Sequence, residues 1–228
     1  MPRQTPSQPS SLKTSDPPNL DEIRKRCSGL RSRLIQDGLY QPQKAQAEVQ
    51  PAAADAETTA LTWRISPEPF RITAEDLRAI QELGSHLLSF YSALNRLYSA
   101  SVRGSQPRWI SRYLDQGKPE TQIEYGRMNR FKQHLPGIIR PDLILTEDGW
   151  IVTELDSVPG GIGLTGSLSR HYSELGHSVI GGPDGMVDGF AKMIRSIAGR
   201  SNPNLAIIVS EESKDYRPEM RWLGNRLN

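Results

Sequence analysis

The sequence predicts an α/β fold with at least partly parallel strand pairing, and three observations lead to it. Short apolar runs alternate with amphipathic helical patterns from Ile138 onward. An Asp-Gly turn divides the apolar runs of RPDLILTEDGWIVTELD, which predicts a hairpin. The longest apolar runs, such as that from Leu205 to Val209, have the length of a strand.

Composition is typical of an ordinary globular protein, with 36% apolar and 24% charged residues among 228. A net charge of +2 gives no strong field toward nucleic acid, and no apolar run approaches the ~20 residues that span a bilayer. The Pro-rich N-terminus lacks the apolar core of a secretory signal, and the single Cys27 cannot form an internal disulfide framework. We therefore expect a cytoplasmic protein with neither nucleic acid nor membrane as partner.

Four segments follow one another along the chain. Residues 1–19 are predicted to be a disordered tail, and residues 20–38 a short helix. Residues 39–60 are polar and rich in Ala, which predicts a flexible linker. The α/β body is expected to occupy residues 61–228.

Within the body, the clearest helix begins after Thr73, which can cap it, with Asp76 in the first turn. Further elements are predicted in order: a helix through Arg127–His134, a helix from about Ser167 to Leu175 stopped by Gly176, a strand at 177–180, a helix at 182–199, a buried strand at 205–210 and a final helix with Pro218 near its start.

A three-residue hairpin loop, with Gly149 in the left-handed position, fixes the expected pairing of the strands. Thr146 then faces Trp150, Asp142 faces Glu154 and Arg140 faces Asp156. Because side chains alternate along a strand, one guanidinium and three carboxylates share a face.

Opposed carboxylates destabilise a sheet unless a cation holds them, and hard oxygen ligands favour Mg²⁺ or Mn²⁺. The pattern therefore predicts metal ligands at Asp142, Glu154 and Asp156. The alternative is a solvated hairpin face whose charges keep the strands soluble, and a slip of one residue would separate Asp142 from Glu154.

A glycine-rich segment follows the hairpin, and Gly161, Gly163 and Gly166 match the dinucleotide pattern GxGxxG. The intervening DSVPG and the acidic strand end argue against that function. We expect instead a close connection in which the backbone amides of Gly160, Gly161 and Gly163 line the metal and phosphate site.

The order R-x-D, then E-x-D twelve residues after the Asp, resembles the metal-binding segment of the glutathionylspermidine synthase-like group of circularly permuted ATP-grasp ligases. The resemblance covers roughly Ile65 to Asn228, and its specific part is Arg140 to Gly163. It implies a preATP-grasp-like domain and part of a permuted ATP-grasp fold.

The resemblance also implies an activity, in which ATP converts a carboxylate into an acyl phosphate and an amine then forms an amide. Asp142, Glu154 and Asp156 would bind Mg²⁺ ions that bridge the ATP phosphates, and Arg140 would stabilise the transferring phosphoryl group.

In this group the nucleotide-gripping lobe lies downstream, so the sequence is expected to be an inactive fragment of a longer ligase. Two alternatives stay open at this stage: a dinucleotide-binding oxidoreductase that uses residues 161–166, and a non-catalytic binding module.

Overall fold

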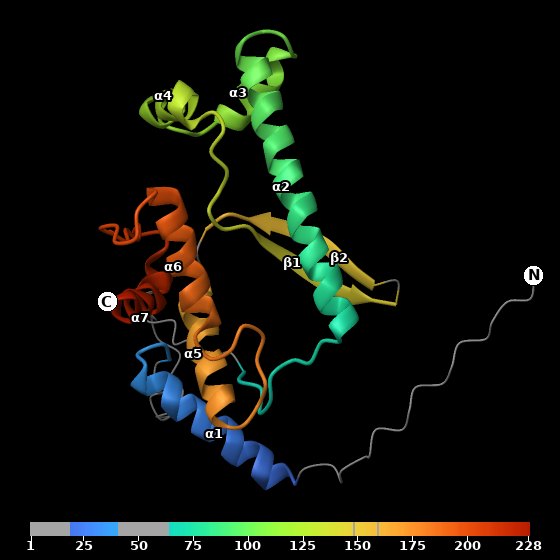
Figure 1. The fold of residues 1–228 in the computed structure, drawn as a ribbon, viewed down its shortest axis with the longest axis vertical. Helices are drawn as coiled ribbons and strands as arrows, with labels where there is room; N and C mark the ends of the chain where they lie inside the picture. The colour runs from blue at the N-terminus through green and yellow to red at the C-terminus, as the bar shows by residue number, and fades with distance from the viewer. Residues whose placement is uncertain (1–18, 41–63, 148, 159) are drawn as a thin grey trace, which may run out of the picture. The chain divides into compact units, whose positions relative to one another are not determined.

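A computed structural model describes residues 19–40, 64–147, 149–158 and 160–228, which form a mixed α/β structure (Figure 1). The elements are α1 (Leu20–Gln36), α2 (Ala74–Val102), α3 (Arg108–Asp115), α4 (Glu120–Arg127), β1 (Arg140–Thr146), β2 (Gly149–Asp156), α5 (Ile162–Glu174), α6 (Gly185–Ala198) and α7 (Arg217–Leu227), with 3-10 turns at Asn129–Phe131 and Lys214–Tyr216.

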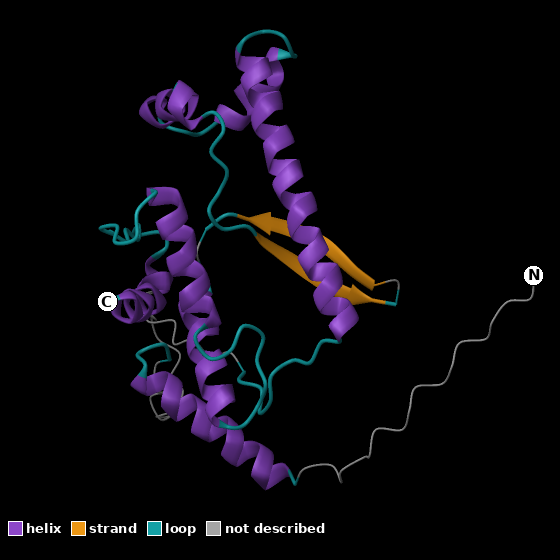
Figure 2. Cartoon of the chain, in the orientation of Figure 1, coloured by secondary structure: helices purple, strands orange, loops and turns teal. Residues whose placement is uncertain are grey.

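Strand structure within the described residues is confined to β1 and β2, which pair antiparallel (Figure 2). The expected parallel pairing is therefore wrong for this part of the chain. The finer ATP-grasp-like architecture stays a prediction.

The described residues divide into two compact units. One contains the described residues up to Pro69 together with Gly161–Asp188 and Ala206–Asn228. The other contains Phe70–Gly160 and Gly189–Leu205. The hairpin belongs to the second unit, and α1, α5 and α7 belong to the first.

The core of the first unit forms where α5 packs between α1 and α7. Leu34 of α1 and Leu223 of α7 are completely buried. At the end of α1, Asp37 Oδ2 accepts a hydrogen bond from the Ser167 hydroxyl and lies 2.9 Å from His171 Nε2, which joins α1 to α5. Most of the predicted tail and linker lies outside the described residues, but Leu39 and Tyr40, placed in that linker, are buried here.

The second unit is organised by α2, whose start matches the sequence prediction. Thr73 caps the helix in a capping box with Asp76. Asp76 also accepts a hydrogen bond of 2.8 Å from the indole of Trp150, at the beginning of β2. One carboxylate therefore fixes the start of the helix and the start of the strand together.

A second contact aligns α2 with β2 along their lengths. The hydroxyls of Tyr91 and Ser157 lie 2.9 Å apart at the far end of the strand. From Trp150 to Ser157 a strand rises about 23 Å, and from Asp76 to Tyr91 a helix rises about 22 Å, so the two elements run together in one direction. The helix thus covers the face of the hairpin that carries Trp150.

Four sequence predictions differ from the structure near turns and unpaired segments. Residues 177–180 form no strand because Gly181 and Gly182 turn the chain there with positive φ. The segment 205–210 forms neither helix nor strand, because the described residues place no strand beside it, and Ile208 is 91% exposed.

The other two differences concern helix ends. The α-helix expected through Arg127–His134 is not formed. Helix α4 precedes it and ends at Arg127, because Met128 takes an extended conformation with ψ 139°, and a 3-10 turn at Asn129–Phe131 follows. Helix α5 begins at Ile162 instead of near Ser167, because the carboxylate of Glu219 accepts hydrogen bonds from the amides at its start. The predicted helices around α6 and α7 are confirmed.

Within the described residues, no helix has the length and apolar character needed to cross a membrane.

Acidification should uncouple α2 from the hairpin. Hydrogen bonds from the Thr73 side chain, the Thr73 backbone and Trp150 lower the pKa of Asp76 below its ordinary value. A carboxyl group with a lowered pKa stabilises the fold above the unfolded-state pKa of about 3.9, and that stability is lost as the pH falls through the folded-state pKa. Asp76→Asn should therefore lower the melting temperature by a constant amount above about pH 5, and its difference from the wild type should begin to shrink only below about pH 4, as the carboxyl group becomes protonated.

Glu75→Gln is the matched control, because it removes a neighbouring carboxylate from the same helical turn. It should leave the acid dependence of the melting temperature unchanged. A difference between Asp76→Asn and the wild type that does not shrink between about pH 5 and about pH 2 contradicts the assigned role of Asp76.

Candidate functional site

The hairpin has two different registers, joined by a β-bulge. Near the turn Thr146 pairs with Gly149 and Leu143 with Val152, so only residues 147 and 148 separate the strands. The expected three-residue loop and the pairing of Thr146 with Trp150 are therefore wrong. Beyond the bulge, Asp142 pairs with Glu154 and Arg140 with Asp156, as the sequence predicts.

Thr153 is the extra residue of this bulge, and it decides where the carboxylates lie. If the register set by the turn continued, Asp142 would face Thr153, and Glu154 would turn to the opposite side of the sheet. The bulge instead advances β2 by one residue. The Thr153 hydroxyl donates a hydrogen bond of 3.2 Å to the carbonyl of Asp142 at this point.

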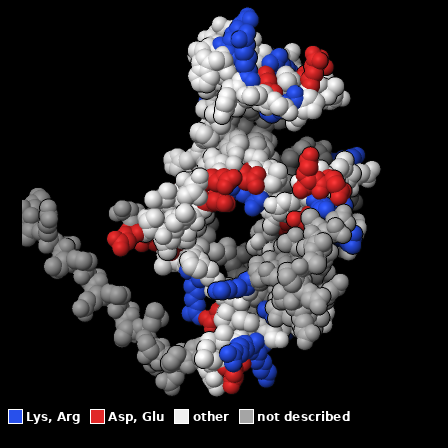
Figure 3. Space-filling model, turned by 180° about the vertical axis from the view of Figure 1, so that it is seen from behind, with Lys and Arg blue, Asp and Glu red and all other residues white. Residues whose placement is uncertain are grey.

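The two faces of the hairpin consequently differ in chemistry. One face carries Trp150 and Leu143 and lies toward α2. The other is apolar near the turn, where Ile144 and Ile151 are half exposed, and polar at the far end. Acidic side chains gather over the hairpin in the space-filling view, with basic atoms beside them (Figure 3).

The polar end contains two kinds of carboxylate. Arg140 donates a hydrogen bond of 3.1 Å to Asp156 Oδ2, while Asp156 Oδ1 accepts from the amides of Ser157 at 2.7 Å and Val158 at 3.2 Å. Asp142 and Glu154, in contrast, are exposed and directly opposite each other. Asp156 is therefore occupied within the protein, and the other two carboxylates face solvent.

This arrangement fits a metal only in part. Across the described ranges of the chain, no three His, Cys, Asp or Glu side chains come together as a metal-binding group, so the expected trio is not assembled. The opposed pair of Asp142 and Glu154 still supplies the protein ligands that a Mg²⁺ site needs, because Mg²⁺ commonly binds one or two carboxylates together with several waters and substrate phosphates. These two residues are the ones that could hold it.

The glycine-rich segment is mostly helical. Gly160 is buried just before α5, Gly161 is its N-cap with φ 82°, and Gly163 and Gly166 lie inside the helix. The loop expected here is therefore wrong, although the positive φ explains the choice of glycine at position 161.

Glu219 of α7 takes up the amides at the start of α5. Its carboxylate accepts hydrogen bonds from Gly161 N at 2.8 Å and Leu164 N at 3.1 Å. This buried acid caps the helix in the way an external anion would, which allows α5 to begin at Ile162. The two amides are not available to a phosphate in this conformation.

Gly163 and Gly166 serve helix packing. A Cβ at position 163 would overlap the backbone carbonyl of Glu219 and lie 2.7 Å from its Cβ. A Cβ at position 166 would lie 3.0 Å from the ring of Trp222. The spacing that resembles a dinucleotide fingerprint thus corresponds to a close approach of α5 and α7.

Sequence reasoning missed Thr153 and Glu219. In the sequence, a bulge shows only as one additional residue in β2, and the expected three-residue loop had accounted for that residue within the turn. Glu219 follows Pro218 in a helix start that predicts an ordinary first-turn acid, and only the tertiary contact reveals the second helix that it caps.

Comparison of the chain with protein-family models, with curated proteins and with solved structures finds no match.

Substitution of Gly163 should separate α5 from α7. Gly163→Ala should lower the free energy of unfolding by about 1–3 kcal/mol, because the added methyl group overpacks a contact between two backbones. Chemical denaturation followed by circular dichroism measures the change.

Gly189→Ala is the matched control, because Gly189 also lies in a helix and its Cβ would meet nothing within 4 Å. It should be neutral or stabilising, by up to about 1 kcal/mol. Equal effects of the two substitutions would show that Gly163 has no packing role.

Proposed function

We propose that the chain contributes the metal and phosphate site of an ATP-dependent carboxylate–amine ligase. The observation that carries the proposal is the pairing of Asp142 with Glu154 across the bulge, on the face turned away from α2. Arg140 adds support, because it pairs with Asp156 on the same face of the hairpin, two residues along β1 from Asp142.

The chemistry required of such a site is largely electrostatic. A carboxylate oxygen attacks the γ-phosphorus of ATP, the bond to ADP breaks, and an acyl phosphate forms. An amine nitrogen then attacks the acyl carbon, phosphate leaves with the C–O bond electrons, and the amine loses a proton. Both steps gain most from countering charge and holding the reactants in place.

Asp142 and Glu154 have the charge and exposure to hold Mg²⁺, which supplies neutralisation of the phosphate oxygens when bound. Their opposition on adjacent strands is unfavourable without a cation. The same pair that weakens the free hairpin is thus the pair that a bound cation stabilises.

Arg140 has a different task. It donates one N–H to Asp156, and a guanidinium carries five N–H donors, so further donors remain for a phosphoryl oxygen. Asp156, fixed by the amides of Ser157 and Val158, holds the guanidinium in place. In this proposal Asp156 positions Arg140, and the metal contacts come from the other two carboxylates.

The dinucleotide alternative has less support from the geometry. Its glycines lie inside α5 against α7, and Glu219 already occupies the amides that a pyrophosphate would use. The carboxylate pair of the hairpin also disfavours a bound pyrophosphate without a metal.

Mn²⁺ can replace Mg²⁺ as a paramagnetic probe of the pair. Titration of Mn²⁺–ATP into the ¹⁵N-labelled chain should broaden the amide signals around Asp142 and Glu154 first. Glu154→Gln should weaken binding by at least about tenfold, because it removes one of the two charges on the metal. Mn²⁺ without ATP should bind more weakly, because the phosphates supply further ligands.

Glu147→Gln is the control, since Glu147 is an exposed acid next to the same hairpin but outside the paired carboxylates. It should leave the affinity unchanged. An equal loss in both variants, or no broadening at the hairpin at any Mn²⁺–ATP concentration tested, contradicts the proposal and favours a solvated hairpin face.

A further inference from the structure

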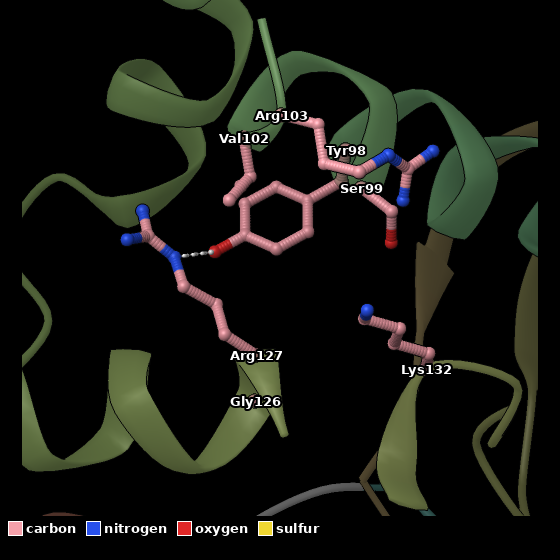
Figure 4. A pocket seen from close by; sticks show the side chains of 7 residues that line it. All are labelled: Tyr98, Ser99, Val102, Arg103, Gly126, Arg127 and Lys132. Carbon is pink, nitrogen blue, oxygen red and sulfur yellow. Dashed lines mark hydrogen bonds between the residues drawn. The ribbon is translucent and has the colours of Figure 1, made fainter. Parts of the chain in front are cut away.

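A pocket in the second unit lies apart from the carboxylate pair, between the last turns of α2 and α4. Its lining comes from α2 and its cap, from the end of α4 and from the residue after the following 3-10 turn: Tyr98, Ser99, Val102, Arg103, Gly126, Arg127 and Lys132. Ser99, Arg103 and Lys132 lie on one side of the Tyr98 ring and Arg127 on the other (Figure 4).

The wall of the pocket is basic on both sides. Arg127 donates hydrogen bonds to Asp115 Oδ2 at 2.6 Å and to the Tyr98 hydroxyl at 3.2 Å, and Tyr98 donates in turn to Asp115 at 2.7 Å. This triangle ties α2, α3 and α4 together and fixes the guanidinium. Asp115 offsets the charge of Arg127 and does not itself line the pocket.

Arg103 and Lys132 have no such compensation. Within the described ranges, no carboxylate lies within ion-pair distance of either side chain, and the hydroxyl of Ser99 has no hydrogen-bond partner. Two positive charges and one free hydroxyl donor therefore border the same open space.

The end of α2 does not explain these cations. A helix C-terminus attracts basic side chains when its last carbonyls lack partners. Here the carbonyls of Ser99, Ala100 and Ser101 accept from the amides of Arg103, Ser105 and Gly104, at 3.2, 3.0 and 3.0 Å. Backbone amides satisfy these three carbonyls, so none of them requires the Arg103 guanidinium as a partner.

We propose that this pocket binds a phosphate group of a small ligand. With Asp115 offsetting Arg127, the remaining charge of Arg103 and Lys132 matches a phosphate monoester, which carries about −1.5 to −2 at neutral pH. Arg103 supplies a planar donor fork, Lys132 a compact charge, and Ser99 a neutral donor. The site is independent of the proposed ligase function, since none of these residues belongs to the hairpin.

Phosphate binding can be measured on the full chain by following amide chemical shifts during titration with inorganic phosphate and with pyrophosphate. Both should move the signals of residues 98–103 and 126–132. Lys132→Ala and Arg103→Ala should each weaken binding by about tenfold, the loss expected for one charge-assisted hydrogen bond. Arg103→Lys should recover part of the loss in Arg103→Ala, because it restores the charge without the donor fork.

Arg112→Ala provides the matched control, because it removes a basic residue of α3 that does not line the pocket. It should leave the affinity for phosphate unchanged. Three results overturn the proposal: no shift with either anion, an equal loss in Arg112→Ala, or binding of acetate as tight as that of phosphate.

Discussion

The β-bulge at Thr153 is the constraint on which the chemistry of the hairpin depends. A two-residue turn sets a register in which the acidic residues of β2 would turn toward α2, where Trp150 and the helix already lie. One extra residue reverses the orientation of every residue that follows it in β2, so Glu154 and Asp156 turn away from α2 while Leu155 turns toward it. The apolar residues near the turn keep the orientation that packing requires, while the far end presents its charges to solvent. Bulges are common next to functional sites because they redirect side chains in this way.

Carboxylates perform three separate tasks in this chain, and the partners of each one decide which. The Asp76 carboxylate fixes the start of α2 and the start of β2 by accepting hydrogen bonds from Thr73 and from Trp150. Glu219 satisfies the first amides of α5 from a neighbouring helix. Asp142 and Glu154 face each other in solvent, where their repulsion is a cost that a bound cation would remove. Acidic residues of the same type therefore stabilise the fold where donors surround them and mark a candidate site where donors are lacking.

Local patterns predicted the elements whose determinants are local. The capping residues Thr73 and Asp76 located the start of α2, and the Asp-Gly turn located the hairpin. The pairing of Asp142 with Glu154 was also predicted, although the additional residue lies at Thr153 and not in the turn.

Tertiary contacts determined the remaining parts of the structure. The segment 205–210 has the composition of a strand, but it forms no strand because the described residues place no neighbour beside it. The glycines at 163 and 166 match a ligand-binding pattern and are explained by the approach of Glu219 and Trp222.

Cross-strand nuclear Overhauser effects in the isotope-labelled chain test the central claim most directly, because they report the register itself. The structure predicts backbone contacts between Asp142 and Glu154 and between Leu143 and Val152, with Thr153 left unpaired. Contacts between Asp142 and Thr153 would show an uninterrupted register. In that case Glu154 lies on the face toward α2, the carboxylate pair does not exist, and the account of the hairpin as a metal and phosphate site is contradicted.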